Sequence, residues 1–166
     1  MNVTLFSTMY SEVLERGVEV VAVALRQSHQ EDQEQLAELR ALVLYDDLTR
    51  LGRYDEVRVR ERFRTTFDPD YTWIIEAEGS MVGCIAFKPR AEAYLLEHFY
   101  IHPDHQGKRI GTQVLNMLLN REEIRGKRVT LNVLQGSPAR RLYERLGFVL
   151  DTEDEVDVFM SKLVPE

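Results

Sequence analysis

The segment 93–125 constrains the fold more than any other part of the chain. Residues 93–102 are rich in apolar and aromatic side chains and stop at Pro103, a pattern that predicts a strand. Apolar residues then recur every fourth position from residue 110, which predicts an amphipathic helix over 110–125. The chain must therefore pass from strand to helix through the short turn at 106–112.

This turn reads Gln-Gly-Lys-Arg-Ile-Gly-Thr and leads into the first turn of the predicted helix. A helix N-terminus leaves about four backbone N–H groups without partners and has about half a positive charge. Lys108 and Arg109 add positive charge, and Gly111 lets backbone and ligand approach closely. The turn is therefore predicted to bind an anion, and phosphate is the natural ligand.

Two common nucleotide-binding loops do not fit the turn. A Walker A loop reads Gly-x-x-x-x-Gly-Lys-Ser/Thr, and a dinucleotide fingerprint reads Gly-x-Gly-x-x-Gly. Gly107 and Gly111 are the only glycines between residues 103 and 125. The turn belongs to neither class.

The rest of the chain alternates between strand and helix patterns, which predicts a mixed α/β sheet with helices on its faces. Residues 1–17 are interpreted as an N-terminal leader and residues 18–166 as one domain. Strands are predicted at 18–26, 71–77, 81–87, 93–102, 128–134, 148–151 and 156–163, and helices at about 31–46, 55–67, 110–125 and 137–147.

Composition excludes several function classes. Hydrophobic residues make up 44% and charged residues 30% of the chain, which is a globular composition. The net charge of −7 and the scattered basic residues argue against nucleic-acid binding. The basic run over residues 58–64 has helical spacing and is interpreted as solvated surface. Cys84 is a lone cysteine, and no signal peptide or membrane span is recognised, so we expect a cytoplasmic protein without membrane partners.

The wider pattern resembles the GNAT N-acetyltransferase superfamily. In that family a strand runs into Arg/Gln-x-x-Gly-x-Gly/Ala, and a later helix reads approximately Asn-Pro-Ala-x-x-Leu-Tyr-Glu-x-Leu-Gly-Phe. Here the strand ends in Phe-Tyr-Ile-His-Pro before Gln106, and residues 137–148 read Ser-Pro-Ala-Arg-Arg-Leu-Tyr-Glu-Arg-Leu-Gly-Phe. The resemblance implies a mostly antiparallel sheet of about seven strands, splayed between strands four and five and flanked by about four helices.

The chain departs from the family pattern at two positions. Arg109 stands where the family usually has glycine, and its side chain could itself meet phosphate. Ser137 stands where the family often has asparagine. It can still accept a backbone N–H and cap the helix that starts with Pro138, but a contact of this residue with the cofactor is open.

The resemblance implies acetyl-coenzyme A as cosubstrate and no metal. The pantetheine arm would pair with strand backbone in the splay, and the pyrophosphate would meet the turn. Asn132 projects from the fifth strand and is a further candidate contact. The implied cofactor-binding residues are Phe99, Tyr100, Ile101, Gln106, Gly107, Lys108, Arg109, Ile110, Gly111, Thr112, Asn132 and Ser137.

Two residues are candidate catalysts. Tyr143 matches the family's general acid, which protonates the departing thiolate; the alternative is a core aromatic residue. Glu97 lies two and four residues before Phe99 and Ile101, so a regular strand places all three on one face. The local string resembles the fourth strand of polyamine acetyltransferases, whose glutamate is proposed to deprotonate the amine through water. A glutamate that binds a cationic acceptor or forms a surface pair is the alternative.

The histidines do not suggest a metal site. His98 and His102 fall on the other face of the predicted strand, and His105 lies in the turn, so surface or supporting roles are expected. The sequence thus predicts an N-acetyltransferase that acts by direct attack in a ternary complex, with a small primary amine as acceptor. The sequence leaves open whether the amine is cationic and whether the protein forms a homodimer. The alternatives are a non-catalytic acyl-coenzyme A-binding module or sensor and an enzyme that acetylates a protein N-terminus or lysine.

Overall fold

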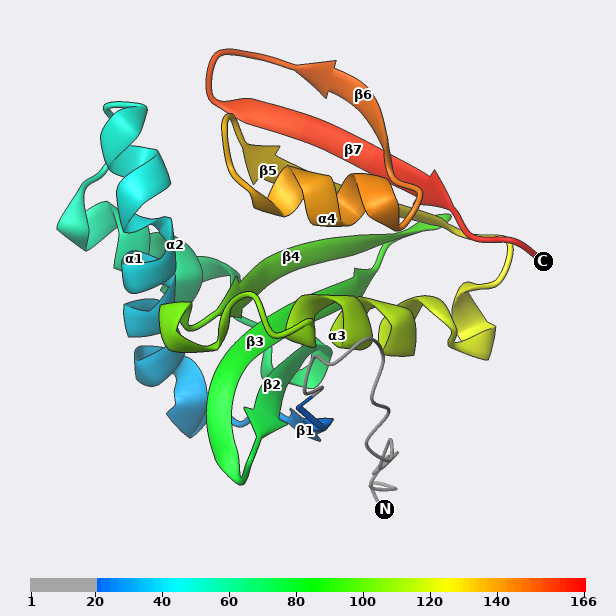
Figure 1. The fold of residues 1–166 in the computed structure, drawn as a ribbon, viewed down its shortest axis with the longest axis horizontal. Coiled ribbons are helices and arrows are strands. Elements are labelled where there is room, and N and C mark those ends of the chain that lie inside the picture. Colours follow the sequence, from blue (N-terminus) through cyan, green and yellow to red (C-terminus); the bar gives the residue numbers. More distant parts are fainter. Residues whose placement is uncertain (1–20) are drawn as a thin grey trace.

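The computed structural model describes residues 21–166, which form a single seven-stranded sheet with helices on both faces (Figure 1). The predicted leader 1–17 and residues 18–20 of the first predicted strand lie outside the described residues. The strands are β1 Val23–Gln27, β2 Thr72–Ala77, β3 Ser80–Pro89, β4 Ala93–Ile101, β5 Arg128–Leu134, β6 Val149–Glu153 and β7 Asp157–Leu163. The helices are α1 Gln33–Arg50, α2 Glu56–Thr66, α3 Ile110–Leu119 and α4 Ala139–Arg145.

The strand order is β1-β2-β3-β4-β5-β7-β6, and every neighbouring pair is antiparallel except β4 and β5. These two strands run parallel and pair only where Ala93–Leu95 faces Arg128–Thr130. Beyond Leu95 their backbones separate. The predicted mixed, mostly antiparallel sheet with a splay between strands four and five is confirmed.

The core has two parts, one on each face of the sheet. Apolar side chains of α1 and α2 pack on β2, β3 and β4 around the fully buried Phe63. Side chains of α3 and α4 pack on the opposite face with most of the strands, around Leu115 and Leu118. The sheet is therefore the middle layer between the two helical layers.

The helix predicted over 110–125 ends earlier, at Leu119, and a 3-10 turn follows over Glu122–Ile124. At 3.6 residues per turn, a continued helix would point Ile124 about 120° away from the face of Leu118. The 3-10 turn instead lets Ile124 bury completely in the α3–α4 core. Burial of this side chain explains the early stop.

Candidate functional site

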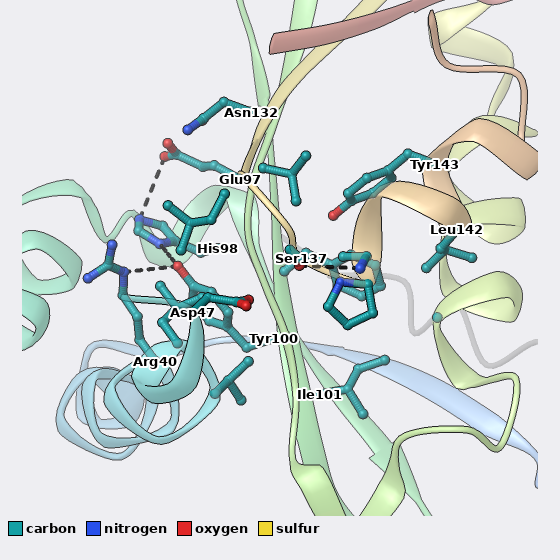
Figure 2. Close-up of a pocket in the computed structure, with 18 of the residues that line it drawn as sticks. Arg40, Asp47, Glu97, His98, Tyr100, Ile101, Asn132, Ser137, Leu142 and Tyr143 are labelled. Atoms are coloured by element: carbon teal, nitrogen blue, oxygen red, sulfur yellow. Dashed lines mark hydrogen bonds and ion pairs between the residues drawn. The ribbon is translucent and has the colours of Figure 1, made fainter. Parts of the chain in front are cut away.

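A cavity of about 1270 Å³ opens at the splay between β4 and β5. Its walls come from α1 and α2 on one side of the sheet and from the 106–112 turn, α3 and α4 on the other. Figure 2 shows this arrangement, with Glu97, His98 and Tyr100 beside α1 and α2, and Leu142 and Tyr143 on the far side of the strands. One continuous space therefore connects the two helical layers.

The turn before α3 has the geometry of an anion site. Gly107 has φ +77° and Arg109 has φ +60°, both in the left-handed region. Arg109 is the N-cap of α3, and no side chain caps the first N–H groups of this helix within the described residues. The left-handed backbone explains why glycine is usual at this position of the family motif. Free N–H groups at the start of a ten-residue helix suit a phosphate group.

A side chain at position 111 would require the Leu142 side chain to shift. A Cβ atom there would come within 2.9 Å of Cδ2 of Leu142 and 3.5 Å of both Phe99 and Ile101. The first turn of α3 therefore packs directly against β4 and α4. The backbone lines the cavity at this point, as the anion-site prediction requires.

Nearly all predicted cofactor residues line this one cavity. The exception is Lys108, whose side chain is half-buried and does not line it. The backbone of β4 beyond Leu95 has no pairing with β5, and the C=O of Ile101 accepts a hydrogen bond from Nε2 of Gln106 at 2.9 Å. The lining residues are Phe99, Tyr100, Ile101, Gln106, Gly107, Arg109, Ile110, Gly111, Thr112, Asn132 and Ser137, together with Glu97 and Tyr143.

Tyr143 lies on α4 and is 5% exposed, between the rings of Phe99 and Phe148. No group in the described residues hydrogen bonds its hydroxyl, which points toward the splay in Figure 2. Burial raises the pKa of this phenol above its ordinary value, with a smaller contribution from Tyr100. The hydroxyl therefore stays protonated over the neutral range and is able to donate a proton into the cavity.

Ser137 and Asn132 have local partners. Oγ of Ser137 accepts the N–H of Ala139 at 3.2 Å, as predicted, although Pro138, one residue later, is the N-cap of α4. Nδ2 of Asn132 donates to Oδ1 of Asp157 at 3.0 Å. Asn132 thus links β5 to β7 at the rim of the cavity.

A β-bulge changes the side on which Glu97 lies. The register between β3 and β4 slips by one residue between Cys84 and Ala86, and His98 adopts φ +48°. Phe99 and Ile101 pack in the α3–α4 core, whereas Glu97 pairs with Ala86 on the face of Tyr100. The prediction that Glu97 shares a face with Phe99 and Ile101 is therefore wrong, because the extra residue breaks the two-residue alternation.

Glu97 is held by an ion pair. Its Oε1 lies 2.6 Å from Nζ of Lys88, which also donates to the C=O of Thr66 at 2.5 Å. The Glu97 side chain is 23% exposed. No ion-pair partner of Oε2 is present in the described residues. One carboxylate oxygen is therefore fixed, and since Glu97 lines the cavity, the other is left to bind water or an amine.

His98 belongs to a buried hydrogen-bond chain, which fits the supporting role of the two expected for it and not the surface one. Nε of Arg40 donates to the Tyr100 hydroxyl at 3.0 Å, and that hydroxyl lies 3.0 Å from Nδ1 of His98. Nε2 of His98 lies 2.6 Å from Oγ1 of Thr66. Burial lowers the pKa of His98 to about 4, and Glu97 offsets part of this shift. The neutral ring therefore accepts from Tyr100 and donates to Thr66.

Tyr100 and Arg40 are further members of this hydrogen-bond chain. Burial raises the pKa of Tyr100 to about 12, so this phenol remains a donor. Nη1 of Arg40 donates to the C=O of Val59 at 2.6 Å, which ties α1 to α2. The interactions hold the bulge, and with it Glu97, in a fixed position against the two helices.

Sequence reasoning missed the cavity residues on α1 and α2. Arg58 and Arg62 belong to the run interpreted as solvated surface; both are exposed, as expected, and both also line the cavity, which the sequence did not indicate. Asp46 and Asp47 line it from α1. Their helical spacing was visible in the sequence, but the packing partner of each helix was not.

Two further properties concern the described residues 21–166. No group of three or more His, Cys, Asp and Glu side chains lies close enough together there to hold a metal ion. In this part of the chain, no helix is both long and apolar enough to cross a membrane.

Comparison with known proteins places this site in a family context. Residues 68–150, half of the chain, match the family model described as an acetyltransferase (GNAT) domain. The L-amino acid N-acyltransferase MnaT of Escherichia coli (strain K12) is 35% identical over 63 residues, which cover 36% of this chain and 37% of MnaT. The chain therefore matches little more than a third of that relative's length.

Solved structures are similar over most of the chain. The PaiA N-acetyltransferase from Thermoplasma acidophilum, in complex with coenzyme A, has a TM-score of 0.69 and 22% identity, over 85% of this chain and 98% of that one. The ribosomal-protein-S18-alanine N-acetyltransferase from Escherichia coli has a TM-score of 0.68 and 17% identity, over 87% and 95% of the two chains. These similarities show the same fold.

Proposed function

Because the chain belongs to the GNAT acetyltransferase family, we propose that it transfers the acetyl group of acetyl-coenzyme A to a primary amine by direct attack in a ternary complex. The observation that supports this most strongly is the single cavity through the splay. It joins an anion site at the start of α3 to the buried hydroxyl of Tyr143 and the carboxylate of Glu97. A cofactor and an acceptor can therefore meet in one space.

The residues present fit acetyl-coenzyme A as a substrate. The N–H groups at 110–112 and the Arg109 side chain would bind the pyrophosphate, and Gly111 leaves the backbone accessible. The unpaired edge of β4 beyond Leu95 would hydrogen bond the pantetheine arm as an added strand. When bound, the thioester supplies an electrophilic carbonyl carbon.

Tyr143 and Glu97 take complementary roles in this proposal. The amine nitrogen attacks the carbonyl carbon, the C–S bond breaks, and the Tyr143 hydroxyl protonates the departing sulfur. The amine must lose a proton to attack, and Oε2 of Glu97 accepts it through water. Since β4 separates the two side chains, acid and base approach the reacting atoms from opposite sides.

Two observations favour a small amine over a protein acceptor. Nη2 of Arg50, at the end of α1, donates to the C=O of Gln135 at 2.7 Å. In this proposal the bond, which joins the end of α1 to the loop after β5, narrows the entrance at that point and supports a small acceptor. The partial relative MnaT is named as an L-amino acid N-acyltransferase, which is also consistent with a small acceptor. We further propose a cytoplasmic location.

Release of free thiol from acetyl-coenzyme A tests the proposal. The purified protein is incubated with acetyl-coenzyme A and a panel of primary amines, and release with at least one amine is expected. Tight binding of acetyl-coenzyme A without release for any amine or peptide would identify a non-catalytic binding module. Faster acetylation of protein N-termini or lysines, seen by mass spectrometry, would identify a protein acetyltransferase.

A further inference from the structure

The four arginines of α2 fall into two pairs with different surroundings. Arg60 contacts Glu38 of α1 at 2.7 Å, and Arg64 contacts Glu34 of α1 at 2.8 Å. Arg58 and Arg62 lie two residues earlier on the helix, on another face, and both line the cavity. Neither forms an ion pair or a side-chain hydrogen bond with any described residue. Two guanidinium groups one helical turn apart therefore lie at the exposed wall of the cavity, and Arg58 also acts electrostatically on the Asp55 carboxylate.

Most carboxylates of the same cavity are already engaged. Glu97 binds Lys88 and Asp47 binds Arg50, at 2.6 and 2.8 Å. Oδ1 of Asp154 accepts two backbone N–H groups, and Asp157 accepts the amide of Asn132. Of the acidic lining residues within 21–166, Asp46 and Glu155 have no such partner. The cavity thus contains open groups of both signs. The positive ones are Arg58 and Arg62 on α2, Arg53 after α1 and Arg145 on α4, and the α2 pair is the one on the side of the sheet where Glu97 lies.

The arginine pair lies close to the reacting side of β4. Arg62 acts electrostatically on His98, the neighbour of Glu97 along the strand, as do Arg40 and Lys88. Arg62 and Arg40 also line the cavity, so positive charge lies beside His98 there, while Glu97 has the opposite effect on this ring. An acceptor whose amine is near Glu97 can place a second group beside Arg58 and Arg62.

We propose that the acceptor is an amine that also has a carboxylate, as an amino acid does, and that Arg58 and Arg62 bind this carboxylate. Guanidinium groups form paired, charge-assisted hydrogen bonds with carboxylates. A zwitterion suits a cavity with open groups of both signs, whereas Asp46 and Glu155 oppose a doubly charged phosphate. This inference rests on the proposed acetyltransferase function and names the substrate class for it.

Matched acceptors test the substrate class. Thiol release is measured with L-leucine, L-leucinamide and 3-methylbutylamine, and with L-phenylalanine, its amide and phenethylamine. O-phosphoethanolamine and ethanolamine form a further pair, which tests a phosphate in place of the carboxylate. Rates are compared at equal concentrations of neutral amine, because the amines differ in pKa. We expect kcat/KM to be about 10- to 100-fold higher for the carboxylates than for their uncharged partners.

Variants of α2 test the residues. Arg58→Gln and Arg62→Gln should each reduce the preference for the carboxylate about tenfold, mainly through KM for the amino acids, with a smaller effect on amines that lack a carboxylate. Arg60→Gln is the matched control, since this arginine contacts α1 and does not line the cavity. Arg60→Gln should keep the full preference for the acceptor with a carboxylate.

The outcomes separate the two proposals. Equal rates for acids, amides and simple amines would overturn the carboxylate inference and leave the acetyltransferase function standing. A preference for O-phosphoethanolamine alone would also overturn it. Thiol release with none of these amines would contradict the enzymatic function and the inference together. A preference that survives in both α2 variants would remove Arg58 and Arg62 from acceptor binding.

Discussion

Glu97 and Phe99 lie on opposite faces of β4, although two residues apart on a regular strand would face the same way. The bulge at His98 separates them. As a result, Phe99 packs beside Tyr143 in the α3–α4 core, while Glu97 faces α1 and α2. The bulge thus distributes the proposed acid and base to the two sides of the splay.

Replacement of Glu97 distinguishes a base from a binding group. Glu97→Gln should lower kcat at saturating amine about 100-fold, since general base catalysis contributes about 10²- to 10⁴-fold. KM for the amine should change little. Glu76→Gln is the control, because Glu76 is also ion-paired, with Arg26 at 3.1 Å, but does not line the cavity. A raised KM with unchanged kcat would instead make Glu97 an acceptor-binding residue.

Tyr143→Phe should lower kcat about 100-fold and leave the affinity for acetyl-coenzyme A nearly unchanged, because only the hydroxyl is lost. Burial keeps this phenol protonated, so no loss of activity from its ionisation is expected up to pH 10. Steady-state kinetics and calorimetric titration measure the two quantities. Tyr71→Phe serves as control, since Tyr71 is exposed and lies outside the cavity. Unaltered turnover in Tyr143→Phe would remove this residue from the mechanism.

The turn before α3 allows a comparison of adjacent cations. Arg109→Gly should weaken binding of coenzyme A about tenfold through loss of a charged contact, and glycine should accept the φ of +60° without strain. Lys108→Gly should change the affinity less than twofold, since Lys108 does not line the cavity. Calorimetric titration of both variants with coenzyme A measures these affinities. Equal losses would show that the turn attracts the cofactor only by its overall charge.

His98 makes stability depend on pH. Its pKa of about 4 in the folded protein lies below the ordinary value of 6.5, so the unfolded chain takes up a proton first as the pH falls. The stabilisation is complete above pH 6.5 and is lost as the pH falls toward 4, by at most about 3 kcal/mol. Denaturant unfolding between pH 7 and pH 4 measures the loss. An NMR titration midpoint of His98 near 6.5 would contradict the buried neutral ring.

The motifs of the sequence were sufficient to predict the turn at 106–112, α4 and the mixed sheet, because each depends on local signals such as Pro103, Ser137 and Gly147. The bulge at His98 could not be predicted, since strand alternation assumes a regular register and no glycine marks the left-handed residue. The structure was also needed to show that Arg60 and Arg64 contact α1, whereas Arg58 and Arg62 line the cavity. Helical spacing shows which arginines share a face, but not whether that face meets α1 or the cavity.

In the proposed reaction the acetyl group passes directly from acetyl-coenzyme A to the amine. Mass spectrometry of the reaction with L-leucine and acetyl-coenzyme A tests it most directly, when thiol release and the intact mass of the protein are followed in the same samples. We predict one N-acetyl-leucine for each thiol released and no acetylated protein at any time. Thiol release in the absence of amine together with an acetylated protein, or no product despite bound acetyl-coenzyme A, would contradict the account.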